Sequence, residues 1–256
     1  MTTISKKRTL MVDAIVPCYN EAPRVGKVLE VLSKSKHIKK IIFVDDGSTD
    51  NSSGEAKKLP NVKIVRLEKN NGKGQAVKAG LRYVTSNAVF LCDADLLGLT
   101  EKTIQIMVKT YQKFPKAMVV GVTQKTKSKT IHWLRKNIAP LMSGQRVIAK
   151  SDLKAILNYP LSYEYGLEAY MNYYYKKNHK PIIRLFLEGV KDVPNFRKTS
   201  RGLKPWVYQH IIFAKKYTLI YTKELPHDTY NNIKSSISKT KNKMMKYQHS
   251  IKKVIQ

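Results

Sequence analysis

The chain has 256 residues, 42% of them hydrophobic and 26% charged, with a formal net charge of +30. Such a chain is long and apolar enough to bury a substantial core, which excludes intrinsic disorder. Its two cysteines are too few for a disulfide framework, and it has no uninterrupted apolar stretch of the roughly 18 residues that a membrane span needs.

Strands and helices alternate in the first half of the chain. Apolar, β-branched runs predict strands at residues 10–16, 40–44, 62–67, 88–92 and 118–122. Helical spacing of apolar residues predicts helices at 21–32, 50–58, 74–83 and 100–114, the last with Thr100 as its N-cap. This alternation predicts an α/β fold with a mostly parallel sheet covered by helices on both faces.

The second half is less regular. The apolar pattern predicts helices at 130–142, 151–157, 163–176 and 203–217, with Ser151 capping the second of them. It also predicts a strand at 144–149 and an extended pair or hairpin at 181–193. The chain ends in a Lys-rich segment, 230–256, with apolar residues at loose helical spacing.

Unusual polar segments follow four predicted strands of the first half. They are Pro17-Cys18-Tyr19-Asn20-Glu21, Asp45-Asp46-Gly47-Ser48, Asn71-Gly72-Lys73-Gly74 and Asp93-Ala94-Asp95. In parallel sheets of this kind, ligands bind beyond the carboxyl ends of the strands. We therefore expect the four segments to converge on one edge of the sheet and to form a ligand site.

Asp93 and Asp95 lie one residue apart, directly after a buried strand. Two carboxylates so close repel each other unless a cation lies between them. Hard divalent cations such as Mg²⁺ and Mn²⁺ accept carboxylate and phosphate oxygens together. The triplet therefore predicts a metal site that can hold a phosphate-bearing ligand, although the same pattern is common in loops without a metal.

The other three segments each have a functional and a structural interpretation. Asp46 could accept hydrogen bonds from a base or ribose while Gly47 allows the tight turn, or the segment could only form a turn. Tyr19 could pack against a base, or its segment could only start a helix. Lys73, between glycines at a helix N-terminus, could bind an anion or lie in a solvated turn. We expect ligand binding because all four segments share one edge.

Together, in order and spacing, these four segments resemble the family 2 glycosyltransferases of GT-A fold over about residues 10–180. The resemblance, which extends to bacterial members and polyprenyl-phosphate sugar transferases, implies a nucleotide-diphospho-sugar transferase that needs Mn²⁺ or Mg²⁺. It implies transfer of a hexose, with inversion, from a UDP-sugar or, less favoured, a GDP-sugar. The implied acceptor is a polyprenyl phosphate, a glycolipid or a cell-envelope glycan.

The resemblance carries site residues over by matching position. Those implied to bind the nucleotide-sugar are Pro17, Tyr19, Asn20, Glu21, Asp46, Gly47, Lys73, Asp93 and Ala94. Asp93 and Asp95 are the implied metal ligands. Many relatives carry a further histidine ligand near the position of Asp192, and a carboxylate there suits the same cations.

The match in the second half is looser. Arg146, in a segment that resembles the acceptor-side Ser-Gly segment of relatives, could neutralise a phosphate or could be an exposed strand-end residue. Glu168, in a segment that resembles Tyr-Gly-x-Glu, is the implied catalytic base, with Glu164 as the second candidate. Glu168 could instead lie on a helix surface. The Glu-Asp base pair of many family members is missing, so the base and the stereochemistry stay open.

The resemblance also suggests a division of the chain. Residues 1–229 would form the catalytic domain, with a nucleotide-binding half (1–123) and an acceptor-binding half (124–229), and residues 230–256 a basic helical extension. Dense positive charge at 125–135, 197–204 and 234–253 predicts contact with an anionic membrane, or else a solvated basic face with a disordered tail. We expect a cytoplasmic protein, peripheral on the cytoplasmic face of the membrane.

The sequence leaves three alternatives to a glycosyltransferase. A sugar-phosphate nucleotidyltransferase also uses an α/β sheet and metal-binding carboxylates, but it usually has a Gly-rich basic loop where this chain has Tyr19-Asn20-Glu21. A nucleic-acid-binding protein would explain the positive charge, but no zinc-ligand spacing, RNA-recognition signature or recognition helix is visible, so no nucleic-acid partner is expected. An inactive binding module is the third, and the intact acidic motifs speak against it.

Overall fold

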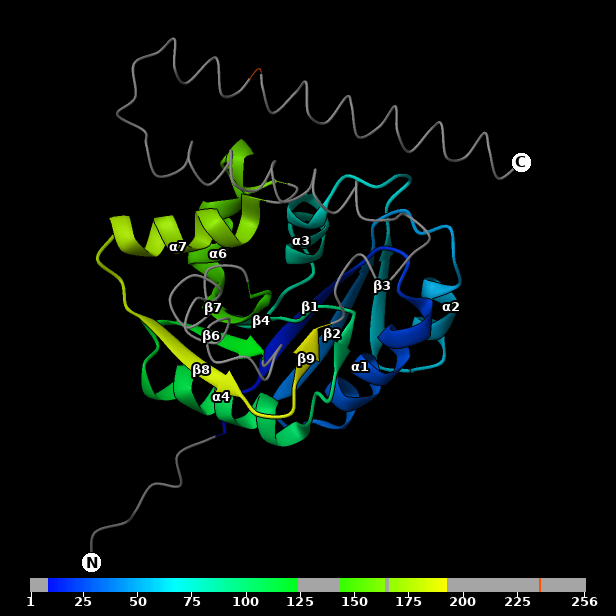
Figure 1. Ribbon diagram of the computed structural model, residues 1–256, viewed down its shortest axis with the longest axis horizontal. Coiled ribbons are helices and arrows are strands. Elements are labelled where there is room, and N and C mark those ends of the chain that lie inside the picture. The colour runs from blue at the N-terminus through cyan, green and yellow to red at the C-terminus, as the bar shows by residue number, and fades with distance from the viewer. Residues whose placement is uncertain (1–8, 124–142, 164–165, 193–234, 236–256) are drawn as a thin grey trace, which may run out of the picture.

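The computed structural model describes residues 9–123, 143–163, 166–192 and 235 (Figure 1). The strands are β1 (Val12–Cys18), β2 (Ile38–Asp45), β3 (Val62–Arg66), β4 (Ala88–Leu91), β5 (Leu96–Leu97), β6 (Met118–Thr123), β7 (Gln145–Ala149), β8 (Ile182–Leu187) and β9 (Lys191–Asp192). The helices are α1 (Ala22–Lys34), α2 (Ser52–Lys57), α3 (Lys73–Leu81), α4 (Glu101–Lys113), α6 (Lys150–Leu157), α7 (Leu167–Lys177) and the 3-10 helix η2 (Pro160–Ser162).

Seven of the described strands form one sheet in the order β3-β2-β1-β4-β7-β6-β8. Strands β1 to β4 run parallel to one another, and β6 is parallel to β8. Strand β7 is antiparallel to both of its neighbours, β4 and β6. The prediction of a mostly parallel sheet is confirmed. Because β7 is reversed, its first residues lie at the edge of the sheet where β4 and β6 end.

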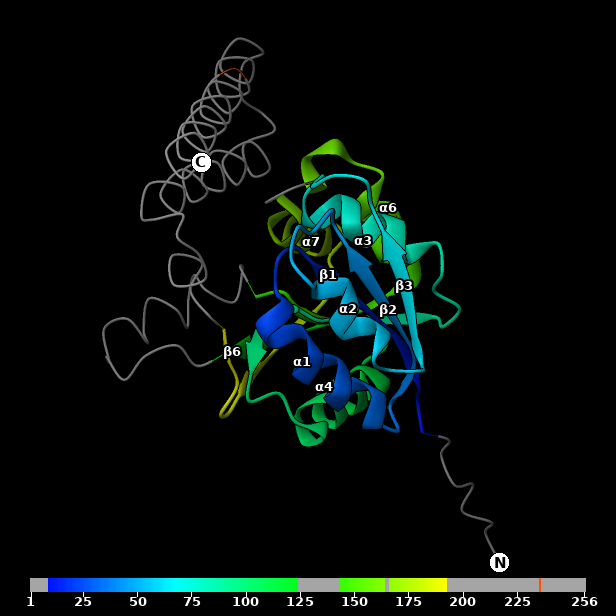
Figure 2. The same ribbon diagram turned by 90° about the vertical axis from the view of Figure 1, so that its right-hand side faces the viewer.

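Helices cover both faces of the sheet (Figures 1 and 2). One core cluster joins the sheet to α1, α2 and α4, and the other joins it to α3, α6 and α7. The central strands β1 and β4 are buried almost throughout, which explains why they appear in the sequence as continuous apolar runs and not as alternating ones. Their carboxyl ends are therefore held rigidly, which suits a site built on them.

Most predicted elements of the first half are confirmed to within a few residues. Thr100 caps α4 as predicted, since its hydroxyl accepts a hydrogen bond from the Thr103 amide at 3.2 Å. The predicted starts of two helices in the second half were wrong. Helix α6 begins at Lys150, so Ala149 holds the cap position and Ser151 lies inside the helix. Helix α7 begins at Leu167, four residues later than predicted.

The extended pair predicted at 181–193 is not a hairpin. Strand β8 joins the large sheet beside β6, whereas β9 pairs with the short strand β5. Gly189 lies between them with a φ of 74°, a conformation that glycine adopts without steric cost. Strand β5 was not predicted, since its two residues, Leu96–Leu97, are too short to show an alternating pattern.

Several predictions fall outside the described residues. These are the helices at 130–142 and 203–217, the domain boundary at 229 and the basic extension at 230–256. Among the helices that the structure describes, none combines the length and the apolar character that crossing a membrane requires.

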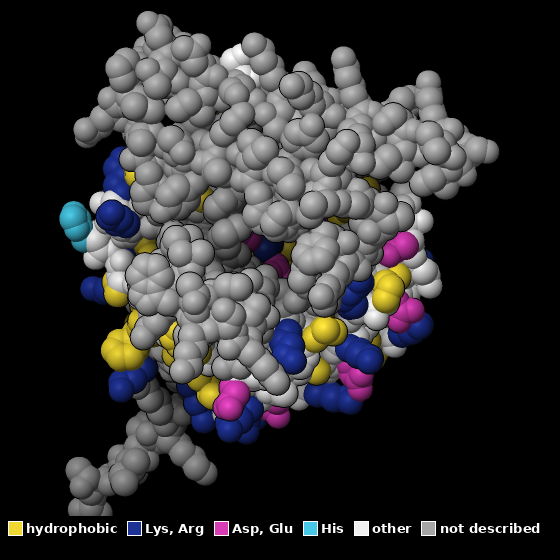
Figure 3. Space-filling model, viewed as in Figure 1, with side chains coloured by type: hydrophobic (Ala, Val, Ile, Leu, Met, Phe, Trp, Pro, Cys, Tyr) yellow, Lys and Arg dark blue, Asp and Glu magenta, His cyan; other side chains and the backbone are white. Residues whose placement is uncertain are grey.

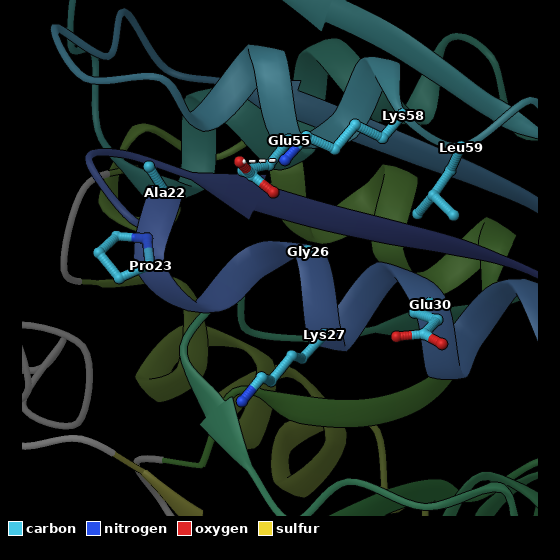
Figure 4. Close-up of a pocket in the computed structure, with 8 residues that line it drawn as sticks. All are labelled: Ala22, Pro23, Gly26, Lys27, Glu30, Glu55, Lys58 and Leu59. Atoms are coloured by element: carbon cyan, nitrogen blue, oxygen red, sulfur yellow. Dashed lines mark hydrogen bonds and ion pairs between the residues drawn. The ribbon is translucent and has the colours of Figure 1, made fainter.

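A groove of about 350 Å³ runs along α1 against α2 (Figure 4). Polar side chains from both helices line it, and the Lys58 ammonium lies 2.7 Å from the Glu55 carboxylate. The acidic triplet Asp93-Ala94-Asp95 is not part of its lining.

Candidate active site

The four polar segments meet at one edge of the sheet, as predicted. They follow the carboxyl ends of β1, β2, β3 and β4, which are parallel neighbours. Strand β7 adds a fifth segment, because it runs in the opposite direction and starts at this edge with Gln145. Side chains from distant parts of the sequence are thereby brought together.

Hydrogen bonds join the segment after β1 to the segment after β2. The Asn20 amide donates to the Ser48 hydroxyl at 3.0 Å, and the Asn20 side-chain oxygen accepts from the Thr49 amide at 2.8 Å. Asn20 has a φ of 57°, a conformation that asparagine adopts more readily than most residues. The Glu21 amide donates to the Ser52 hydroxyl at 2.9 Å, and the Glu21 carboxylate accepts from Arg24 at 3.1 Å. Asn20 and Glu21 thus shape the loop that presents Tyr19.

Asp45 and Asp46 both accept hydrogen bonds inside the protein. Asp45 is fully buried and accepts from Ser48, Ser53 and Arg66. Burial alone would raise the pKa of Asp45, but the hydrogen bonds from both serines and the Arg66 charge hold it below its ordinary value. Asp46 is also buried, and burial raises its pKa in spite of two backbone donors.

Those donors are the amides of Asn71 and Gly72, at 2.9 and 2.8 Å from the two Asp46 carboxylate oxygens. Asp46 therefore anchors the loop that precedes α3. The neighbouring Gly47 has a φ of 72°, and a Cβ there would approach the Lys69 and Asn70 backbone to 2.6–2.8 Å. This position accordingly requires glycine.

The centre of the site is a cluster of three charged side chains. The Lys73 ammonium, at the start of α3, lies 2.5 Å from Asp93 Oδ1 and 2.6 Å from Glu168 Oε1. Glu168 comes from the first turn of α7, 95 residues after Lys73. The exposed fractions of the side chains are 27% for Lys73, 23% for Asp93 and 11% for Glu168. Acidic and basic groups lie together deep in the middle of this face in Figure 3.

Lys73 remains charged in this cluster. Burial would lower its pKa, but the charges and hydrogen bonds of Asp93 and Glu168 outweigh burial and raise the pKa above its ordinary value. The nearby Cys92 thiol is buried, and both burial and the charges of Asp93 and Asp95 raise its pKa, which keeps it protonated. Cys92 thus behaves as a small apolar residue of the core.

Sequence reasoning gave no role to Gln145 and Gly144, which complete the cluster. The Gln145 side-chain amide donates to Asp93 Oδ2 at 2.9 Å, so that Lys73 and Gln145 each bind one oxygen of the same carboxylate. A Cβ on Gly144 would overlap both the Asp93 carboxylate and the Lys73 ammonium. Both residues belong to the sequence segment Ser143-Gly144-Gln145-Arg146. Their position next to Asp93 could not be predicted from that segment, because it depends on the reversed direction of β7.

We expect Gly144→Ala to disturb this cluster. The added methyl group must displace the Asp93 carboxylate and the Lys73 ammonium from their present positions, and overpacking of this kind costs roughly 1–3 kcal/mol. Thermal unfolding with and without Mn²⁺ and UDP, the ligands that the family resemblance implies, should show a smaller ligand-induced stabilisation than in the unmodified protein. Gly26→Ala on α1, where the nearest atom is Glu55 Oε2 at 3.1 Å, is the matched control. Equal ligand-induced shifts in all three proteins would contradict the proposed packing.

The structure contradicts one of the two predictions made for Arg146. The side chain is fully buried and not exposed, which rules out the surface interpretation. Its guanidinium donates to the Ser143 carbonyl oxygen and to the Asn172 side chain, both at 2.8 Å. Arg146 therefore ties the start of β7 to α7, and a contact with a phosphate stays a prediction.

Four more of the predicted site residues lie at or just after the ends of β1 and β4. Pro17 is the penultimate residue of β1, Tyr19 is half-buried, and Ala94 is buried between the two aspartates of the triplet. Asp95 is half-buried. The backbone of Asp192 pairs with Leu96, the residue after Asp95, so its main chain lies beside the triplet, while its side chain lies outside the part that is described. Glu164 also lies outside it.

The donor chemistry at this point fits a hard divalent cation. Within residues 9–123, 143–163 and 166–192, no three His, Cys, Asp or Glu side chains form a ready cluster of metal ligands. A cation held by one or two carboxylates and completed by phosphate oxygens needs no such cluster, and Mg²⁺ is commonly bound in that way. Asp93 and Asp95 can supply those carboxylates, provided that a phosphate-bearing ligand supplies the rest.

Comparison with known proteins identifies the family. Residues 13–183 match the model of glycosyl transferase family 2, about two thirds of the chain. An uncharacterized glycosyltransferase of Escherichia coli (strain K12), YaiP, is 42% identical over 88 residues, which are 33% of this chain and 22% of YaiP. The aligned part of the chain therefore spans about a fifth of the length of that curated relative.

Solved structures share the fold. A crystal structure of glucosyl-3-phosphoglycerate synthase from Mycobacterium tuberculosis, in complex with Mn²⁺, UDP and glucosyl-3-phosphoglycerate, has a TM-score of 0.65 and 16% identity and covers 82% of this chain and 80% of that one. Another, with Mn²⁺, UDP and phosphoglyceric acid, has a TM-score of 0.66 and 17% identity over 82% and 78% of the two chains. The sheet and helices described above have the GT-A fold, and the chain belongs to glycosyl transferase family 2.

Proposed function

We propose that this enzyme transfers a hexose from a nucleotide diphospho-sugar to an acceptor with the help of Mn²⁺ or Mg²⁺, and that its donor is a UDP-hexose in preference to a GDP-hexose. The observation that carries the proposal is the cluster of Lys73, Asp93 and Glu168 where four loops converge. The family supports glycosyl transfer over the nucleotidyltransferase and nucleic-acid alternatives. The structural relatives bound to Mn²⁺ and UDP support the choice of cation and base.

The residues of the sheet edge have distinct tasks in this proposal. Asp95 and Asp93 would hold the cation, which would supply Lewis-acid stabilisation of the leaving diphosphate. Lys73, already charged and directed at the same place, would contribute a second positive charge toward the diphosphate. The loops of Tyr19 and Asp46, fastened to each other and to the loop before α3, would form the wall on which the nucleoside lies.

Glu168 is the proposed base, and its position adds a condition to that role. Its Oε1 is bound to Lys73, so a proton from an acceptor hydroxyl would have to go to Oε2, or Lys73 would first have to move toward the diphosphate. The ion pair also joins Glu168 to the donor-side carboxylate Asp93 through one ammonium group. The inverting outcome is proposed on the resemblance alone.

The acceptor and location are proposed from composition. A net charge of +30 and the Lys/Arg-rich segments 197–204 and 234–253 favour an acceptor at an anionic membrane surface, such as a polyprenyl phosphate or a glycolipid, over a free glycan. The enzyme would then act as a peripheral protein on the cytoplasmic face. In the proposed division of the chain, residues 124–229 bind the acceptor and residues 230–256 contact the membrane.

A donor panel tests the proposed function. UDP, GDP and their hexose conjugates are each mixed with the full chain in Mn²⁺ and in EDTA, and thermal unfolding is followed. At a ligand concentration of about 100 times Kd, UDP-hexose with Mn²⁺ should add roughly 2.7 kcal/mol, a rise in Tm of roughly 5–10 °C, and EDTA should remove it.

The same samples are then incubated with vesicles that carry a polyprenyl phosphate, or with a soluble glycan, and release of UDP is measured. Faster release with the vesicles is the expected result. Failure of every nucleotide to stabilise the chain, together with tight salt-dependent binding of DNA or RNA, would overturn the proposal in favour of a nucleic-acid-binding protein.

A further inference from the structure

We propose that Gln145 is a positioning residue of the donor site: together with Ser143 it holds the Asp93 carboxylate in the orientation that cation and diphosphate binding require. The inference rests on the function proposed above and adds a residue for which neither the motifs nor the family resemblance gave a role. The two carboxylate oxygens of Asp93 accept hydrogen bonds from two distant segments of the chain, Oδ1 from Lys73 and Oδ2 from Gln145.

The Gln145 side chain is built into the protein and is not a chance surface contact. Gln145 is 1% exposed. Its Nε2 lies 2.9 Å from Asp93 Oδ2, and its Oε1 accepts from the Ser143 hydroxyl at 2.8 Å. This amide orientation is the one that the neighbours require, because the opposite one would direct a carbonyl oxygen at a carboxylate.

Ser143 connects Gln145 to the sheet. Its hydroxyl lies within hydrogen-bond distance of both Gln145 Oε1 and the Gly121 carbonyl oxygen of β6, so its single hydrogen serves one of two acceptors at a time. Gln145 is itself paired with Gly121 across β6 and β7. The Ser143 carbonyl oxygen accepts from the buried Arg146 guanidinium at 2.8 Å. The segment is therefore held from several directions.

The two donors to Asp93 differ in a way that matters for function. Lys73 is a cation. A divalent metal competes with it for the Asp93 carboxylate, and a diphosphate competes with Asp93 for the Lys73 ammonium, because each ligand changes the local charge. Gln145 is neutral, so its hydrogen bond to Asp93 can persist when a cation binds the other oxygen. Outer-shell partners of this kind orient a metal ligand, and their loss typically costs 10- to 100-fold in metal affinity or activity.

A double-mutant cycle tests the inference. Calorimetry measures Kd for UDP with Mn²⁺ in the unmodified 256-residue chain and in Gln145→Ala, Ser143→Ala and the double variant. Gln145→Ala should raise Kd by roughly 10- to 100-fold. Ser143→Ala should raise it less, and adding it to Gln145→Ala should change Kd by no more than about twofold, since Ser143 acts through Gln145. Gln112→Ala, near the far end of α4, is the control and should keep the Kd of the unmodified protein.

Thermal unfolding without ligand separates positioning from folding. A purely structural Gln145 would lower Tm without ligand and leave Kd unchanged in the folded protein, which would overturn the inference. Additive effects of the two substitutions on Kd would also overturn it. The proposed function fails separately, if the unmodified protein itself does not bind UDP and Mn²⁺. If Gln145→Ala does not fold, Ser143→Ala alone decides, because an unchanged Kd would show that the Gln145 amide needs no orienting partner.

Discussion

Lys73→Met is expected to destabilise the ligand-free protein and to abolish detectable binding of a nucleotide diphosphate. The substitution leaves Asp93 and Glu168 facing each other without the cation that separates them. Removal of one partner from a fully buried ion pair costs about 3–5 kcal/mol. Because 27% of the Lys73 side chain is exposed, we expect roughly 2 kcal/mol, which lowers Tm by roughly 4–8 °C for a chain of this size.

Two further variants show whether the loss comes from the charges. Lys78→Met on the same helix is the control, because the Lys78 ammonium contacts the Tyr163 hydroxyl at 2.8 Å. It should leave nucleotide binding unchanged. Adding Glu168→Gln to Lys73→Met removes one of the two negative charges that repel each other. It should restore part of the lost Tm, but not nucleotide binding. A Lys73→Met protein that binds UDP normally would refute a role of Lys73 toward the diphosphate.

Asp95→Asn is expected to remove the cation dependence of nucleotide binding while the protein stays folded. Asp95 is half-buried at the sheet edge, and asparagine keeps the shape of the side chain but loses the charge that attracts Mn²⁺ or Mg²⁺. Loss of a direct ligand should cost at least as much as loss of an outer-shell partner, so we expect transfer to fall by roughly 100-fold or more.

Activity and binding are measured over a range of Mn²⁺ concentrations. Partial recovery at high Mn²⁺ would show that the cation site is weakened but still present. Glu68→Gln, an exposed position in the loop after β3, removes the same charge and should keep full activity. An Asp95→Asn protein with unchanged Mn²⁺ dependence would show that the cation is held elsewhere.

The sequence was sufficient to predict the first half of the fold and the location of the site. Strands β1 and β4 are buried on both faces, so their apolar runs were easy to recognise, and the polar residues after them could only lie at the carboxyl edge. Thr100 was predicted as a cap because capping is a local interaction. These features depend on few residues that are close in the sequence.

The features that the sequence did not reveal depend on long-range contacts. Gln145 contacts Asp93 only because β7 runs against its neighbours, and no local pattern specifies the direction of a strand. Burial of Arg146 depends on α7 packing over the start of β7. Glu168 was predicted to face the site by resemblance, but its pairing with Lys73 joins residues that are 95 positions apart. The turn at Gly189 likewise separated two strands that looked like one hairpin.

The central claim is that the sheet edge binds a nucleotide diphospho-sugar together with a divalent cation. Calorimetric titration of the full chain with UDP-glucose, once in Mn²⁺ and once in EDTA, tests this most directly. We predict binding at one site per chain in Mn²⁺ and a loss of at least tenfold in affinity in EDTA, roughly 1.4 kcal/mol or more. Equal affinity in both buffers, or no heat in either, would contradict the account.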